Sequence, residues 1–357
     1  MPTPPHRKIS QRACDFCAIT ESPTTRLLRC SGCQASYYCN KTHQAADRPR
    51  HKTGCKTVKK ARETYETEDQ KLRNFQGDIM TPSHPFENCI GHFWGILETR
   101  DYMRARYDFV DTIMQVFGAT GGRIDVVRSS LEHLLDMLRL CRGDNMGVRD
   151  VVPGLYIRLG RDQEAYDFLK WWGTTAKQDT YDWGDTESSY LDVMNADALE
   201  EPVGGWKGKW IDLSHAVAVV LIKVRILIDL QAAQNTTRAL HGTIPQEIID
   251  LIRDEIGSSG IVGSHPDILR GDTEKLASVV ETIKAQIKEL YKDINEYCPD
   301  FWPMFLGNPQ AAANQRPGAY THGSKEEARL AIGYSIASWT ETAGAFDTIK
   351  ALGLSSS

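Results

Sequence analysis

Cysteines and histidines near the N-terminus occur in four pairs with short internal gaps. In chain order the pairs are Cys14-x2-Cys17, Cys30-x2-Cys33, Cys39-x3-His43 and His51-x3-Cys55. Thiolate sulfur and imidazole nitrogen are the ligands that zinc prefers in structural sites. A two-residue gap lets a tight turn aim both sulfurs at one ion, and a three-residue gap puts both side chains on one face of a helical turn. These eight ligands match two tetrahedral zinc ions and leave no open position for catalysis.

The remaining cysteines are sparse. Six of the nine lie in this segment, which leaves Cys89, Cys141 and Cys298 for the rest of the chain. The first residues lack the apolar stretch of a secretory signal, and the most apolar stretch, residues 216–230, is too short to span a bilayer. We therefore expect a soluble intracellular protein, cytoplasmic or nuclear, without membrane association. Thiols stay reduced there, so the clustered cysteines are expected to bind metal rather than form disulfides.

Basic residues, like the cysteines, are concentrated in the N-terminal segment. Residues 1–62 carry 13 basic and 3 acidic side chains, whereas the whole 357-residue chain has a net charge of -5. Such a basic segment is a first sign of nucleic-acid binding. However, the spacing lacks the Cys-x2-Cys…His-x3-His pattern of fingers that read bases. We therefore expect a protein partner, and nucleic-acid association through the basic segment is the alternative.

The cysteine-rich segment resembles the MYND zinc finger in more than its ligands. The shared residues are Arg29-Cys30-Ser31-Gly32-Cys33, Tyr37-Tyr38-Cys39-Asn40-Lys41, Gln44, Asp47 and Pro49-Arg50-His51-Lys52. The resemblance implies two interleaved structural zinc sites, with Cys14, Cys17, Cys39 and His43 on one ion and Cys30, Cys33, His51 and Cys55 on the other. It also implies short proline-containing peptides as ligands, bound as an added strand at a small sheet edge.

Two positions depart from the pattern of that family. His43 stands where the family usually has cysteine, and Arg48 follows Asp47 where the family usually has tryptophan. Histidine is a competent zinc ligand, so we expect the first site to be retained. In relatives the aromatic residue lies on the surface that grips the partner peptide. Arg48 is therefore expected to change partner specificity rather than the fold.

Beyond the finger, apolar residues recur with helical spacing. The predicted helical stripes are Phe86–Leu97, Tyr102–Val116, Val127–Leu138, Leu276–Tyr297 and Ala328–Trp339. Strand-like alternation is scarce, so the expected fold is mainly α: a small zinc-stabilised module followed by an all-α domain. The predicted boundaries are a disordered tail at 1–9, the finger at 10–57, a charged helix or linker at 58–80, the helical domain at 81–350 and a tail at 351–357.

Residues 125–172 resemble tetratricopeptide-like (TPR-like) helices. The similarity rests on a leucine-rich run, Leu131–Leu138, followed by Leu159-Gly160-Arg161 and Glu164-Ala165-Tyr166. The domain is thus expected to be TPR-like or irregular, and a MYND finger joined to such a body resembles a group of fungal proteins. Stacked helices of this kind form surfaces that hold proteins. A plain helical domain without a groove is the alternative.

Enzymatic function is not expected. MYND fingers also occur in SET-domain methyltransferases, but the Asn-His-Ser-Cys hallmark and the strand-rich pattern of those enzymes are missing. The chain also lacks the common phosphate-loop, nucleophile-elbow and zinc-protease motifs. We predict a regulatory adaptor or other interaction protein, with oligomeric state left open. The alternatives are a nucleic-acid-associated regulator and an enzyme of unidentified type in the helical body.

Overall fold

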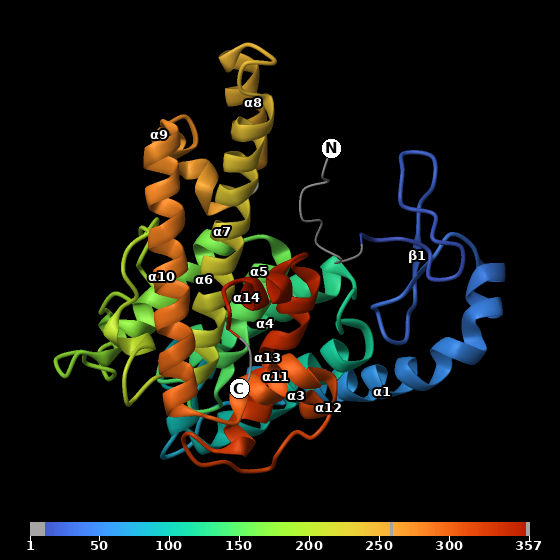
Figure 1. Ribbon diagram of the computed structural model, residues 1–357. Helices are drawn as coiled ribbons and strands as arrows, with labels where there is room; N and C mark the ends of the chain where they lie inside the picture. The colour runs from blue at the N-terminus through green and yellow to red at the C-terminus, as the bar shows by residue number, and fades with distance from the viewer. Residues whose placement is uncertain (1–10, 258–259, 355–357) are drawn as a thin grey trace. The chain divides into compact units, whose positions relative to one another are not determined.

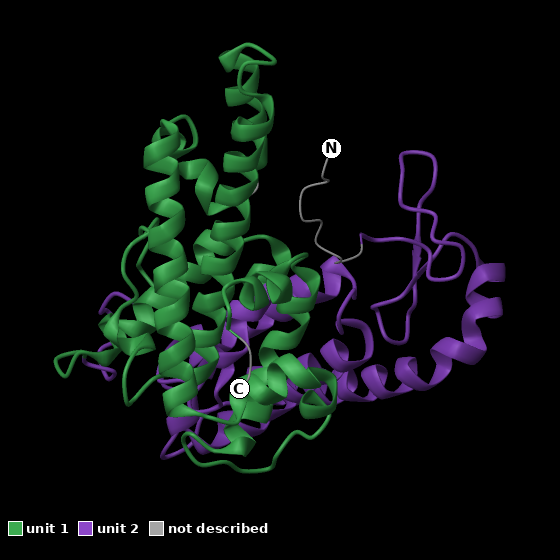
Figure 2. Cartoon of the chain, viewed as in Figure 1, with its two compact units in different colours: residues 1–7, 156–181, 191–357 green, residues 8–155, 182–190 purple. Residues whose placement is uncertain are grey.

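A computed structural model describes residues 11–257 and 260–354 of the chain (Figure 1). The predicted tail at 1–9 and residues 355–357 of the predicted C-terminal tail lie outside the described residues. Over the described part, fourteen α-helices follow a single two-stranded sheet, which confirms the mainly α fold class. The chain forms two compact units (Figure 2). Of the described residues, unit 2 holds 11–155 and 182–190, and unit 1 holds the rest.

Unit 2 contains the cysteine-rich segment and the first helices. Its elements are β1 (Leu28–Arg29), β2 (Tyr37–Tyr38), α1 (Lys41–Arg73), α2 (Pro85–Asn88), η1 (Phe93–Gly95), η2 (Leu97–Thr99), α3 (Arg100–Phe117), α4 (Ile124–Leu140), η3 (Val148–Asp150) and the start of α5 (Val152–Leu159). The two strands are antiparallel, with Leu28 opposite Tyr38 and Arg29 opposite Tyr37. The sheet is too short to be stable alone and depends on what packs around it.

The long helix α1 links the cysteine-rich segment to the helices that follow. It begins after Asn40, whose side chain accepts a hydrogen bond from the backbone N–H of His43, and it continues through the charged segment to Arg73. Its later turns pack on α3, where the ring of Tyr65 stacks on that of Phe109 at 5.8 Å. One helix therefore carries metal-ligand candidates at its start and tertiary contacts at its end.

The cysteine-rich segment shares one hydrophobic core with α3 and α4. Side chains from both regions form a single buried cluster that includes Leu27, Tyr38 and Val58 from the first region and Phe109 and Val126 from the second. A segment of this size buries too little apolar surface to be stable alone. Packing against α3 and α4 supplies part of the missing apolar burial.

The helices predicted from periodicity are present with one exception. Apolar spacing correctly predicted α3 and α4, but the single helix expected over residues 86–97 was wrong. That stretch consists of the short helix α2 and two 3-10 turns, η1 and η2. Gly91 has φ of +89°, a conformation that interrupts a right-handed helix, and the hydroxyl of Thr99 donates to the carbonyl of Ile96 at 2.9 Å. Local turn geometry outweighed the apolar spacing here.

Unit 1 is built around three long helices. Its elements are the end of α5, α6 (Asp162–Gly173), η4 (Thr175–Lys177), η5 (Gly204–Trp206), α7 (Leu213–Leu240), α8 (Gln246–Gly257), η6 (Ile261–Ser264), α9 (Pro266–Leu269), α10 (Thr273–Tyr297), α11 (Phe301–Gly307), α12 (Pro309–Ala313), α13 (Lys325–Glu341) and α14 (Ala345–Ala351). Helix α7 packs against α8, α10 and α13, which explains why its first half is apolar on every side.

A buried cation inside unit 1 has three hydrogen-bond partners. The ammonium of Lys223, in the middle of α7, donates to the carbonyls of Ala198 and Glu200 and to the side-chain oxygen of Gln286, at 2.7–2.8 Å. Burial lowers its pKa to about 8. No helix among the described residues combines the length and apolarity needed to cross a membrane. The TPR-like character of residues 125–172 stays a prediction.

Candidate metal centre

Two tight turns of the same design carry the first four cysteines. In the first turn the N–H of Ala18 donates to the carbonyl of Cys14 at 2.8 Å, and in the second the N–H of Gln34 donates to the carbonyl of Cys30 at 3.0 Å. Ala18 and Gln34 both have positive φ, 58° and 56°, which is uncommon for residues other than glycine. Each turn places two sulfurs on the same side of the chain.

The remaining ligand candidates come from β2 and α1. Cys39 follows β2, His43 lies in the first turn of α1, and His51 and Cys55 lie on the inner face of the same helix. Their i, i+4 spacing brings His51 and Cys55 one above the other. The structure thus places all eight predicted residues in unit 2 and gathers them into two groups of four.

The first group, site 1, consists of Cys14, Cys17, Cys39 and His43. Their ligand atoms all lie within 4.8 Å of one another. The sulfurs of Cys17 and Cys39 are 3.8 Å apart, and Nδ1 of His43 lies 3.8 Å from the sulfur of Cys14 and 3.0 Å from that of Cys39. Cys14 is buried and the other three are partly exposed. This is the grouping that the family resemblance implied.

The second group, site 2, consists of Cys30, Cys33, His51 and Cys55, all of them buried. The sulfurs of Cys30 and Cys55 are 3.7 Å apart, and Nε2 of His51 lies 3.4 Å from the sulfur of Cys30 and 3.7 Å from that of Cys33. In a tetrahedron with zinc–sulfur bonds of about 2.3 Å, two sulfurs lie about 3.8 Å apart. The donor set and its spacing therefore fit zinc at both sites.

Charge at the thiols also favours a bound cation. Burial opposes ionisation of Cys14, but hydrogen bonds from backbone groups such as those of Cys17 and Cys39 prevail and lower its pKa to about 6. In site 2, burial raises the pKa of Cys33 to about 12, and the charges of Cys30 and Cys55 add to the rise. Thiolates crowded at this distance repel one another. A dication that neutralises them couples metal binding to folding.

Comparison with known proteins agrees with this geometry. Residues 14–55 match the family model of the MYND finger. This N-terminal module is a MYND zinc finger. Such a finger is a zinc-binding module for protein interaction, and the match runs from the first ligand to the last. No curated protein and no solved structure matches the chain.

Sequence reasoning missed the residues that hold the ligands of the MYND finger in place. The hydroxyl of Ser36 lies 3.2 Å from Nδ1 of His51, so both nitrogens of that ring have a partner. The N–H of Ala35 donates to the sulfur of Cys33 at 3.4 Å. Gly32 lies so close to Cys55 that an added Cβ would be 2.8 Å from its sulfur. Of these, only Gly32 was part of the recognised motif.

A second set of contacts ties the finger to α1 and α4. The hydroxyl of Tyr38 donates to the buried carboxylate of Asp47 at 2.8 Å, and Arg50 donates to the other oxygen of Asp47 at 2.8 Å. Asp15 accepts from Arg123, just before α4, at 2.6 Å. Arg123 lies far from the finger in sequence, and no local signal identifies it as a partner.

The two departures from the family pattern occupy different surroundings. His43 points into site 1, and its ring packs at a tilt against the exposed ring of Phe16, with the ring centroids 4.8 Å apart. Arg48 lies on the exposed side of α1. The structure therefore brings His43 to the position of a ligand and leaves Arg48 on the surface of the MYND finger.

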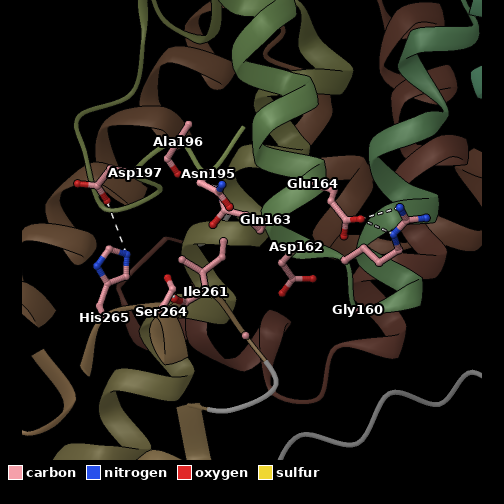
Figure 3. A pocket seen from close by; sticks show the side chains of 12 residues that line it. Gly160, Asp162, Gln163, Glu164, Asn195, Ala196, Asp197, Ile261, Ser264 and His265 are labelled. Atoms are coloured by element: carbon pink, nitrogen blue, oxygen red, sulfur yellow. Dashed lines mark hydrogen bonds and ion pairs between the residues drawn. The ribbon is translucent and has the colours of Figure 1, made fainter. Parts of the chain in front are cut away.

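Unit 1 contains a pocket of about 530 Å³ between the start of α6, the loop around Asn195 and η6 (Figure 3). Several of its acidic side chains have partners: Glu164 accepts from Arg161 at 2.6 Å, and Asp197 lies 3.9 Å from His265. The pocket is separate from the MYND finger in the chain. The expectation that the body is not an enzyme stays a prediction.

Proposed function

We propose that this protein is a non-enzymatic interaction adaptor. In this proposal each site of the MYND finger holds one structural Zn²⁺, the finger binds a short proline-containing peptide, and the helical body acts as a scaffold for a second partner. The observation that carries the proposal is an open sheet edge on the finger. Unpaired backbone groups at such an edge can hydrogen bond to an added peptide strand.

The two edges of the small sheet differ. In an antiparallel pair, alternate residues direct their backbone N–H and C=O groups away from the partner strand. At the outer edge of β2, both backbone groups of Tyr37 bond to Asp15: the Tyr37 carbonyl accepts from the backbone N–H of Asp15 at 2.8 Å, and the Tyr37 N–H donates to the Asp15 carboxylate at 3.0 Å. On β1 the corresponding residue is Arg29, whose backbone groups have no partner among the described residues.

The chemistry of this edge suits a peptide that contains proline. The outward-facing backbone of Arg29 offers a single N–H and a single C=O. A bound segment therefore needs few N–H groups of its own, which suits proline. Leu28, on the same strand, is exposed. Its apolar side chain offers contact area to proline rings and neighbouring aliphatic residues.

A matched pair of variants at one position tests the proposal. The zinc-loaded full chain is screened against displayed twelve-residue peptides, and the best proline-containing binder is titrated against wild type, Arg29→Ala and Arg29→Pro. We expect Arg29→Ala to retain binding because it keeps the backbone N–H, and Arg29→Pro to lose at least ten-fold because it removes it. Equal binding by the two variants, or a screen without proline-containing binders, would refute edge binding.

A further inference from the structure

A row of cations runs along the first part of α1. The basic stripe, as we name it, consists of Lys41, Arg48, Lys52, Lys56 and Lys59. At 100° per residue these positions fall within about 80° of one another around the helix, and they cover about 27 Å of its length. Each of them is exposed. The stripe is therefore one surface rather than a scatter of charges.

The cations of the stripe differ in pairing from those later in α1. Near its end, Arg62 pairs with Glu66 at 2.5 Å, Lys71 with Glu68 at 2.6 Å and Arg73 with Asp69 at 2.7 Å. In the stripe only Lys59 has a carboxylate within 4.0 Å in the part of the chain that the structure describes. The unpaired positive charge thus lies between Lys41 and Lys60, in the part of α1 that begins within the MYND finger.

This arrangement opposes the stability of the helix. Arg48, Lys52 and Lys56 are like charges at i, i+4 spacing, which repel one another. Cations near a helix N-terminus also oppose the helix dipole, and the first turn of α1 contains no acidic residue. Neither effect contributes to the fold, and an anionic partner would relieve both.

We propose that the basic stripe binds an acidic segment of a partner protein. The inference rests on the proposed function, because it describes a second part of the partner that the finger holds. The first turn of α1 carries both the start of the stripe and a ligand candidate of the finger: Lys41 lies two residues before His43, whose ring contacts the exposed Phe16 on the other side of the helix. A partner bound to the finger would reach the stripe with an acidic segment that passes around this turn.

The spacing of the stripe fits acidic side chains on a protein. Arg48, Lys52 and Lys56 are separated by about 6 Å along the helix axis. Carboxylates repeat at about 6 Å on one face of a partner helix and at about 6.6 Å on one face of a strand. Residues 41–60 include no Phe, Tyr or Trp on which bases could stack. A protein partner is therefore favoured over nucleic acid.

Charge reversal tests the stripe with defined probes. The zinc-loaded full chain is titrated by fluorescence anisotropy with a labelled sixteen-residue peptide containing six glutamates, with the same peptide carrying glutamine instead, and with a DNA duplex of equal charge. The stripe variant combines Arg48→Glu, Lys52→Glu and Lys56→Glu. The control combines Lys288→Glu, Lys292→Glu and Lys325→Glu, three exposed positions in unit 1 with the same change in charge.

We expect wild type to bind the glutamate peptide at least ten-fold more tightly than the glutamine peptide, with affinity falling as salt rises. The stripe variant should lose at least ten-fold, and the control less than three-fold, with zinc content and helicity unchanged in both. Equal affinity for the two peptides, or equal losses in the two variants, would overturn the proposal. Tighter stripe-dependent binding to the duplex would assign the surface to nucleic acid instead.

The same assay separates this inference from the proposed function. Arg29→Pro should lose the proline-containing peptide and retain the glutamate peptide, because it alters the sheet edge and leaves α1 intact. If wild type does not bind the glutamate peptide while Arg29→Pro still loses the proline-containing peptide, the stripe proposal alone is refuted. The reverse result refutes edge binding, and with it the claim that both surfaces serve one partner.

Discussion

Ser36 supports His51 from the side that faces away from the cysteines. Its hydroxyl oxygen lies 3.2 Å from Nδ1 of His51, while Nε2 of the same ring faces the sulfurs of Cys30 and Cys33. With the lone pair of Nε2 directed at the metal position, Nδ1 carries the proton and donates to Ser36. This bond sets both the tautomer and the orientation of the ring.

Removal of that hydroxyl should weaken metal binding at site 2. We expect Ser36→Ala to lower zinc affinity there about ten-fold, the lower end of the effects of such outer partners. Competition with a chromophoric chelator measures the change. Ser31→Ala, at an exposed position of the same turn, serves as the control and should behave as wild type. Identical affinities for the two variants would show that Ser36 does not orient the ligand.

Gly32 should not tolerate a side chain. A Cβ at this position would lie 2.8 Å from the sulfur of Cys55, and a sulfur engaged in site 2 has little freedom to move. We expect Gly32→Ala to lower the free energy of unfolding by about 1–3 kcal/mol, the range for overpacked sites. Gly95→Ala is the control, because a Cβ there meets nothing within 4 Å. Chemical denaturation of the zinc-loaded proteins compares them, and equal stability would contradict the close packing.

Chelation should unfold the finger while leaving unit 1 folded. The two sites join segments far apart in sequence, and binding of a structural zinc supplies about 10–16 kcal/mol of folding free energy in small peptides. Hydrogen exchange with and without a strong chelator should show loss of protection over residues 14–58. Protection in α7 and α10 should remain, and restored zinc should reverse the change. Unchanged exchange in the first turns of α1 would exclude metal-dependent folding.

A buried ion pair in unit 1 should be costly to break. Arg158 donates to both carboxylate oxygens of Glu341 at 2.8 Å, and both side chains are 2% exposed. Glu341→Gln removes the negative charge with which this buried guanidinium pairs, so we expect a loss of about 3–5 kcal/mol in urea unfolding. Lys292→Gln is the control: its pair with Glu296 is exposed, and it should cost less than about 1 kcal/mol. A small effect at Glu341 would mean that water reaches the pair.

The pH dependence of stability should contain a contribution from His133. Burial, with the nearby charge of Arg106, lowers the pKa of His133 to about 4, whereas the unfolded chain takes up this proton at about 6.5. Because the unfolded state binds the extra proton between these values, stability falls as the pH decreases through that window. From pH 7.5 to 5.5, wild type should lose about 1 kcal/mol more than His133→Gln. Equal losses in denaturation of the two proteins would show that His133 is protonated in the folded state.

Short-range sequence patterns were enough to predict the ligand residues of the candidate site and much of the helical body. Pairs such as Cys14 and Cys17, or His51 and Cys55, are set by the geometry of a turn or of one helical turn, so their spacing alone predicts them. The same reasoning predicted α3, α4, α10 and α13 from the recurrence of apolar residues. It was wrong over residues 86–97, where Gly91 and the turns that follow it interrupt the helix.

Long-range contacts decided what spacing could not. The folded chain brings distant segments together. As a result Cys17 and Cys39 share a site, Ser36 orients His51, and Arg123 contacts Asp15. The sequence by itself thus determined which residues can bind metal and that the body is helical. The family resemblance implied which ligands share a site, and the tertiary structure decided how the finger shares a core with α3 and α4 and where charge stays exposed. The physical reason is that bonded geometry over a few residues governs ligand spacing and helical periodicity. The summed packing of distant side chains governs how the finger, α3 and α4 come together.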